Sequence, residues 1–103
     1  MIKTIEIGGI PVDFKASAAF PVFYRAHTGR DFFAEFNKLG EGMSDGTMEM
    51  IWLMYRQAGG DMEYEPWLDQ FGFGDLLEAM PEIVALLTES QTTTSKAKNR
   101  AAR

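Results

Sequence analysis

Apolar and polar residues alternate through the first fifteen positions of the chain, on either side of the pair Gly8-Gly9. A glycine pair supplies the positive φ angles that a two-residue turn requires, so the pattern predicts a β-hairpin. One face of this hairpin is apolar and carries Ile5, Ile7, Val12 and Phe14. Because a lone hairpin is marginally stable in water, we expect this face to rest on helices.

Beyond residue 16 the apolar residues recur at helical spacing in several short segments. We predict helices from Ser17 to His27, from Asp31 to Leu39, from Ser44 or Asp45 to Ala58, from Pro66 to Phe71, and from Asp75 onward. The last segment has one expected apolar stripe of Leu76, Leu77, Met80, Ile83, Val84 and Leu87. Pro81 lies inside it and is expected to kink or split the helix, because proline lacks the N–H group that a helix interior needs.

The ends of these segments carry residues that favour helix boundaries. Ser17, Asp31 and Asp75 are expected N-caps, as is Ser44 or Asp45, since short polar side chains accept hydrogen bonds from the first free N–H groups of a helix. Glycines end or separate the segments at Gly29, Gly40, Gly42, Gly59 and Gly60.

The pattern indicates a mainly α (α+β) protein with an N-terminal β-hairpin followed by four or five short helices. A chain of 103 residues leaves room for one domain, which we place over residues 1–90. Residues 91–103 contain no large apolar side chain, so they are expected to form a flexible, disordered basic tail. This tail is either a solubilising end or a short docking segment for an acidic surface.

The charge is unevenly distributed along the chain. There are 10 basic and 15 acidic residues, a net charge of −5, and four of the basic residues follow Ser95. Residues 1–95 therefore hold six basic and fifteen acidic residues, a net charge of −9. Because non-specific affinity for nucleic acid comes mainly from clustered Lys and Arg, we expect the body of the chain to have no nucleic-acid partner.

No set of residues points to catalysis or to metal binding. His27 is the single histidine, and no nucleophile motif accompanies it. Asp61, Glu63 and Glu65 alternate in a predicted loop but lack the glycine and the final glutamate of a calcium loop. The absence of cysteine excludes disulfides and thiolate zinc sites. We therefore expect no enzyme activity, no cofactor and no metal.

The apolar stretches fall far short of the ~20 residues that cross a bilayer. The first residues also lack the apolar core of a signal peptide. We expect a cytoplasmic protein with no membrane partner.

Methionine and aromatic residues are numerous, with seven Met and thirteen Phe, Tyr and Trp. Four of the methionines lie in or beside the third predicted helix: Met43, Met48, Met50 and Met54. Two stripes follow that helix, one of Met48, Trp52 and Tyr55 and the other of Ile51, Met54 and Ala58. One stripe could pack in the core while the other contacts a protein partner, a role that suits Met, Trp and Tyr. The candidate partner contacts are Met48, Trp52, Tyr55, Trp67 and Phe71; the alternative interpretation is that these residues fill the core.

Three further features form a recognisable combination. The alternating segment from Ile5 to Lys15 precedes the phrase Tyr-Arg-x-x-x-Gly-Arg-Asp, which consists of Tyr24, Arg25, Gly29, Arg30 and Asp31. The helix around Ile51–Tyr55, the segment near Trp67-Leu68 and an apolar final helix follow. With these features, residues 2–90 resemble the tail assembly chaperones of long-tailed bacteriophages and prophages, particularly those of Gram-positive hosts.

The resemblance implies a protein that binds the long, aggregation-prone tape measure protein and keeps it soluble in the host bacterial cytoplasm. It also implies help in recruiting the major tail tube protein, and absence from the finished virion. The family has no catalytic residues to carry over, and its binding residues have no strict signature. The apolar third helix makes a homo-oligomer a further expectation. The alternative function is that of a structural head–tail or tail completion protein of the virion.

Overall fold

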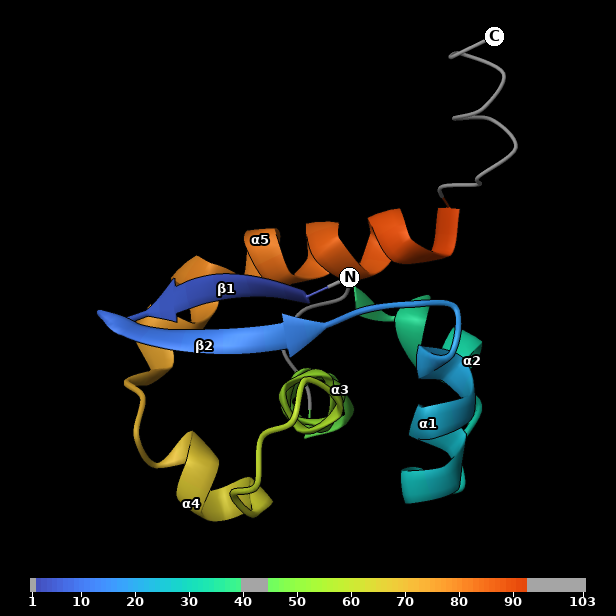
Figure 1. Ribbon diagram of the computed structural model, residues 1–103, viewed down its shortest axis with the longest axis horizontal. Coiled ribbons are helices and arrows are strands. Elements are labelled where there is room, and N and C mark those ends of the chain that lie inside the picture. The colour runs from blue at the N-terminus through green and yellow to red at the C-terminus, as the bar shows by residue number, and fades with distance from the viewer. Residues whose placement is uncertain (1, 40–44, 93–103) are drawn as a thin grey trace, which may run out of the picture.

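The structure is a computed structural model of the chain that describes residues 2–39 and 45–92. Within these ranges two strands are followed by five helices (Figure 1). The strands are β1 (Ile2–Ile7) and β2 (Ile10–Lys15), and the helices are α1 (Phe20–Thr28), α2 (Phe32–Phe36), α3 (Asp45–Gln57), α4 (Tyr64–Leu68) and α5 (Phe73–Thr92). The predicted mainly α, mixed α+β fold is confirmed, although α5, with 20 residues, is not short.

The two strands form the predicted antiparallel hairpin, in which Ile5 lies opposite Val12. Gly8 and Gly9 have φ angles of 58° and 85°, a left-handed conformation that glycine adopts without steric cost. One face of the hairpin is buried through Ile5, Ile7, Val12 and Phe14. The prediction of a single apolar face is therefore confirmed.

Two helices support this hairpin. Figure 1 shows α5 running along the β1 side and α3 crossing beneath β2. Helix α5 contacts β1, and helix α3 contacts β2. Leu53 and Met54 of α3 are fully buried, as is Ile83 of α5. Burial of a side chain of this size stabilises a fold by about 1.5–3 kcal/mol. The core of the protein thus lies between the hairpin, α3 and α5.

Helices α1 and α2 pack together beside α3 through aromatic rings. Phe20 and Tyr24 of α1 and Phe32 of α2 are all buried. The ring of Phe32 meets that of Phe20 edge-on at 5.5 Å between centroids and that of Tyr24 at 6.0 Å. Such edge-to-face contacts are a favoured geometry, because the positive edge of one ring meets the negative face of the other.

The predicted end of α1 at Gly29 and the predicted cap of α2 at Asp31 are confirmed, whereas the predicted cap of α1 at Ser17 is wrong. Gly29 ends α1 with a φ of 75°, and the carboxylate of Asp31 caps α2 by accepting a backbone N–H at 3.1 Å. Ser17 is not the N-cap of α1, since the helix begins at Phe20 with Ala19 at the cap position. The Ser17 carbonyl instead accepts the N–H of Phe20 at 3.0 Å, which forms a turn ahead of the helix.

Other boundaries also differ from the prediction, including the end of α4, which lies at Leu68 rather than at Phe71. Helix α2 ends at Phe36, before Leu39. Helix α4 begins at Tyr64 rather than at Pro66, and the proline is tolerated because N–H groups in the first turn have no partner within the helix. Helix α5 begins at Phe73, so Asp75 lies in its first turn and does not cap it.

Pro81 does not split α5, which continues through it to Thr92. The missing N–H of Pro81 leaves the carbonyl of Leu77 without its helical partner. Leu77 is 45% exposed and Pro81 is exposed, so this part of the helix lies at the surface, where water can hydrogen-bond to the carbonyl. The exposed position explains why the helix is not split.

Helix α5 also extends past the domain boundary expected at residue 90. Gln91 is helical, and its side-chain amide donates to the carbonyl of Ser17 at 3.0 Å. The first two residues assigned to the tail, 91 and 92, are therefore part of α5, which corrects the prediction. The predictions for residues 93–103, Gly40, Gly42, Met43 and Ser44 lie outside the described residues.

Candidate functional site

Trp67, a predicted partner contact, lies in the core with 1% of its surface exposed. Its ring stacks on that of Tyr55 at 5.1 Å and meets the rings of Phe71 and Phe14 edge-on at 5.1 and 6.3 Å. Contacts of this kind contribute about 0.5–1.5 kcal/mol each beyond the burial of area. The structure thus brings Tyr55, Trp67 and Phe71 into one aromatic cluster, in which Trp67 has almost no surface to offer a partner.

The stripe of Met48, Trp52 and Tyr55 on α3 is half-buried, and the chain itself covers much of it. The indole N–H of Trp52 donates to the carbonyl of Met62 at 3.0 Å, and the N–H of Met62 donates to the hydroxyl of Tyr55 at 3.1 Å. The guanidinium of Arg56 lies 5.6 Å from the centre of the Trp52 ring. The segment between α3 and α4 therefore packs on this stripe, and contact between the stripe and another protein stays a prediction.

A hollow of about 450 Å³ opens beside the aromatic cluster. Pro11 and Val12 of β2 line one side, and Tyr55, Met62 and Trp67 line another. Two of the predicted partner contacts, Tyr55 and Trp67, therefore line this hollow.

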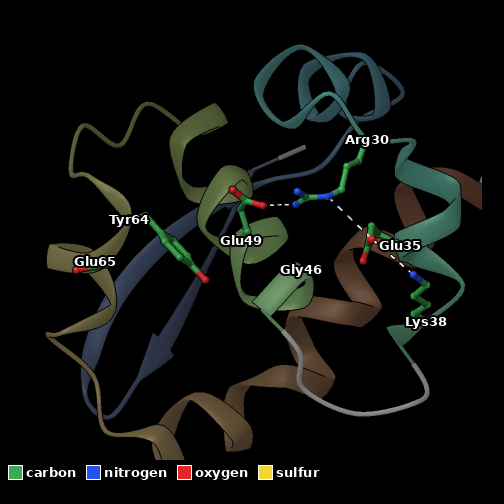
Figure 2. A pocket seen from close by; sticks show the side chains of 7 residues that line it. All are labelled: Arg30, Glu35, Lys38, Gly46, Glu49, Tyr64 and Glu65. Carbon is green, nitrogen blue, oxygen red and sulfur yellow. Dashed lines mark hydrogen bonds and ion pairs between the residues drawn. The ribbon is translucent and has the colours of Figure 1, made fainter.

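A larger pocket, of about 760 Å³, is lined mainly by charged and polar groups. Its lining residues are Arg30, Glu35, Lys38, Gly46, Glu49, Tyr64 and Glu65 (Figure 2). Arg30 lies between α1 and α2 and points at the carboxylate of Glu49 on α3, to which it donates a hydrogen bond. Glu35 lies 4.0 Å from the Nε of Arg30 and 3.8 Å from the Nζ of Lys38. The pocket is therefore crossed by a chain of ion pairs.

Arg30 carries a fixed positive charge in this pocket. The hydrogen bond to Glu49, and after it the one to Tyr24, raises the pKa of Arg30 above its already high usual value. Arg30 therefore stays charged at any physiological pH. Glu35 and Glu49 each pair with a cation, so positive and negative charges balance one another across the pocket.

Four of the five named residues of the Tyr-Arg-x-x-x-Gly-Arg-Asp phrase meet at one joint of the fold, whereas Arg25 is exposed. Tyr24 is buried, and its hydroxyl accepts a hydrogen bond from Arg30 at 3.3 Å. Gly29 turns the chain out of α1, Arg30 pairs with α3 through Glu49, and Asp31 caps α2. We call Tyr24, Gly29, Arg30 and Asp31 the α1–α2 joint. The joint connects α1, α2 and α3.

The remaining sequence candidates for chemistry are not assembled into a site. His27 is exposed, its Nδ1 lies 2.9 Å from the carbonyl oxygen of Phe23, and its ring lies 4.2 Å from that of Phe23. Across residues 2–39 and 45–92, no three His, Asp or Glu side chains are grouped so that they could hold a metal ion. In the same ranges no helix has the length and apolar character to cross a bilayer.

Helix α5 presents a surface that the sequence analysis missed. The single predicted apolar stripe divides into a buried side and an exposed one, since Leu76, Ile83 and Leu87 are at most 3% exposed whereas Leu77 is 45% exposed. The exposed side begins with Phe73 and Leu77 and continues into the half-buried Met80 and Val84, and we call these four residues the outer stripe. Its 4-3-4 spacing is the signal that could have separated it from the buried side, because this spacing is typical of a helix–helix seam.

Comparison with known proteins finds no family model, no curated protein and no solved structure that matches this chain.

Proposed function

We propose that this chain is a bacteriophage tail assembly chaperone that binds the tape measure protein and keeps it soluble in the host bacterial cytoplasm. In this role it also helps to recruit the major tail tube protein. The observation that carries the proposal is the α1–α2 joint. Four of the residues on which the family resemblance rests, Tyr24, Gly29, Arg30 and Asp31, lie together in the structure and follow an N-terminal hairpin, which supports the proposal that they form a shared structural feature.

The charge and the surface of the chain support the same proposal. A protein that holds an aggregation-prone client needs an apolar surface to bind it and a net charge that keeps the complexes apart. The outer stripe of α5 supplies exposed apolar area, and residues 1–95 carry a net charge of −9. Several copies along one long client would give avidity from individually weak contacts.

The direct test is co-expression with a tape measure protein from the same genome. The measurement is the fraction of tape measure protein that stays in the supernatant after high-speed centrifugation, determined by immunoblot. We expect this fraction to rise sharply with the wild-type chain and to stay low with an unrelated acidic domain of similar size. An equal fraction with both proteins would rule out the chaperone function.

A further inference from the structure

Strand β1 has an edge that no neighbouring strand covers. Within residues 2–39 and 45–92 the sheet consists of β1 and β2 alone. The two-residue glycine turn makes Ile7 and Ile10 a pair joined by backbone hydrogen bonds, and such pairs then alternate along the hairpin. Thr4 and Glu6 fall between these pairs, so their N–H and C=O groups point away from β2. We call this side of β1 the free edge.

The outer edge of β2 is blocked in a way that the free edge is not. Pro11 lies opposite Glu6, so the N–H that proline lacks is one that would point outward from β2. Proline at such a position protects a strand from pairing with another chain. Thr4 and Glu6 keep both backbone groups, and their side chains are exposed. Of the two edges, the free edge is therefore the one suited to pair with a further strand.

Helix α5 lies beside β1 without closing the free edge. Figure 1 shows the helix running along β1 on the side away from β2. Glu82 of α5 pairs with Lys3 of β1 at 3.5 Å, and the carboxylate of Asp75 adjoins Gly8 at the end of the strand, where an added Cβ would clash with it. The side chains of Lys3 and Glu82 are both more than half exposed, so solvent reaches the edge at this point.

The flank of α5 beside the free edge is acidic. Because successive helical residues are rotated by about 100°, four exposed carboxylates share this side of the helix. We call them the acidic flank: Asp75, Glu78, Glu82 and Glu89. Among the residues that the structure describes, Lys3 alone pairs with this flank, and solvent screens that pair strongly. A strand added at the free edge would therefore meet a negative field on the side that faces α5.

We propose that the free edge of β1 is a docking site for an extended segment of another protein that carries Lys or Arg at alternate positions. The segment would pair as an added strand with the N–H and C=O groups of Thr4 and Glu6. Because side chains alternate between the two faces of a strand, all of these basic residues would face the acidic flank. The proposal concerns a surface and a class of partner, and it does not rest on the proposed function.

Two other occupants fit the free edge less well. A second copy of β1 would bring the acidic flanks of two chains side by side, and like charges across an interface are unfavourable. The chain's own residues 93–103 are basic, but α5 runs antiparallel to β1 and ends ten residues beyond Glu82, or about 15 Å along its axis. At about 3.3 Å per extended residue, most of these eleven residues would be used before they reached Glu6.

The first measurement uses a synthetic peptide of about eight residues in which Lys and Thr alternate, a length typical of a strand. Its affinity for the full chain is measured by fluorescence anisotropy, and the exchange of single backbone amides is followed by NMR. We expect the bound peptide to slow exchange at Thr4 and Glu6 by about tenfold or more, because the added strand hydrogen-bonds to these N–H groups. A peptide in which Glu replaces every Lys should bind at least about tenfold more weakly at low salt.

The second measurement compares two proline variants at one cross-strand pair. Thr4 and Asp13 lie opposite each other, and the hydroxyl of Thr4 donates to the carboxylate of Asp13. Thr4→Pro and Asp13→Pro both remove that hydrogen bond and one outward N–H, but only Thr4→Pro alters the free edge. We expect Thr4→Pro to weaken binding of the Lys peptide by about tenfold and Asp13→Pro to leave it unchanged. Circular dichroism melts check that both variants remain folded.

The third measurement tests the acidic flank. Glu78→Gln with Glu82→Gln should weaken binding of the Lys peptide by about fivefold or more at low salt, and the effect should shrink as salt is added. Glu63→Gln with Glu65→Gln is the matched control, because it removes the same charge from the exposed surface at the start of α4. We expect the control to bind nearly as the wild type does.

Several outcomes would overturn the proposal. These are unchanged amide exchange at Thr4 and Glu6, equal binding of the two peptides, or equal effects within either pair of variants. A dimer of the chain that Thr4→Pro dissociates would assign the free edge to a second copy. Binding of the Lys peptide that tightens tenfold when Lys96, Lys98, Arg100 and Arg103 are replaced with Gln would assign it to residues 93–103. No tape measure protein is used, so the chaperone function stands or fails separately.

Discussion

The ring of Tyr55 lies stacked on the ring of Trp67, with 5.1 Å between the centroids and 23° between the planes. This contact joins the end of α3 to α4. The hydroxyl of Tyr55 accepts the N–H of Met62, so the same residue also holds the segment that links the two helices. The Tyr55–Trp67 pair therefore holds together α3, α4 and the segment between them.

Replacing Trp67 with alanine should lower the free energy of unfolding by about 3–5 kcal/mol, because it leaves a large cavity among Phe14, Tyr55 and Phe71. Urea unfolding followed by circular dichroism measures this change. Phe73→Ala is the control, since Phe73 is 58% exposed and should shift the free energy by no more than about 0.5 kcal/mol. Similar losses in the two variants would contradict the core position of Trp67.

Gly60→Ala should destabilise the protein by about 1–3 kcal/mol, because a Cβ there would clash with the ring of Tyr55 and would force that ring to move. Gly74→Ala should instead stabilise the protein. No atom lies within 4 Å of a Cβ at Gly74, and alanine in a helix is favoured over glycine by up to about 1 kcal/mol. Thermal melts of the two variants compare the signs; a stabilised Gly60→Ala would mean that Tyr55 does not close against this backbone.

The ion pair between Arg30 and Glu49 should contribute little energy, although it links two helices. Arg30 is 44% exposed, so solvent screens the pair. A double-mutant cycle with Arg30→Ala and Glu49→Ala should give a coupling of about 0.2–1 kcal/mol, which decreases in ~1 M salt. A coupling that persists unchanged at high salt would indicate that the pair is shielded from solvent.

Gln91→Ala should lower the free energy of unfolding by about 0.5–1.5 kcal/mol, because it removes the hydrogen bond to the carbonyl of Ser17. Glu89→Ala, two residues earlier on the exposed face of the same helix, should change the free energy of unfolding by less than about 0.5 kcal/mol. Chemical denaturation of both variants tests whether the end of α5 is anchored to the body. No loss in Gln91→Ala would show that it is not.

Local signals in the sequence were sufficient for several parts of the fold. Gly8-Gly9 predicts the hairpin because only a few residues adopt positive φ easily, and Asp31 predicts a cap because its side chain satisfies a backbone N–H of the same helix. Gly29 ends α1 for a similar reason. Each of these features depends on neighbours a few residues away.

Features that depend on distant parts of the chain were not predictable in the same way. Trp67 follows the rule for an interface anchor and the rule for a core residue equally well, and only its contacts with Phe14 and Tyr55 decide between them. The division of α5 has the same cause, because the narrow two-stranded hairpin covers one side of the helix and leaves Leu77 exposed. The spacing of both stripes can be read from the sequence. Which stripe is buried depends on the width of the hairpin that packs on the helix, and local sequence patterns do not give that width.

As a tail assembly chaperone, the chain would hold the tape measure protein during assembly and would not be a part of the particle. The most direct measurement is quantitative mass spectrometry of two samples from phage-producing cells: the material that co-purifies with the tagged chain from the lysate, and the purified virions. We expect tape measure protein to be the main protein that co-purifies with the chain from the lysate, and we expect no chain in the virions. A chain found at constant stoichiometry in virions, without tape measure protein in the lysate sample, would contradict this expectation and favour a structural head–tail or tail completion protein.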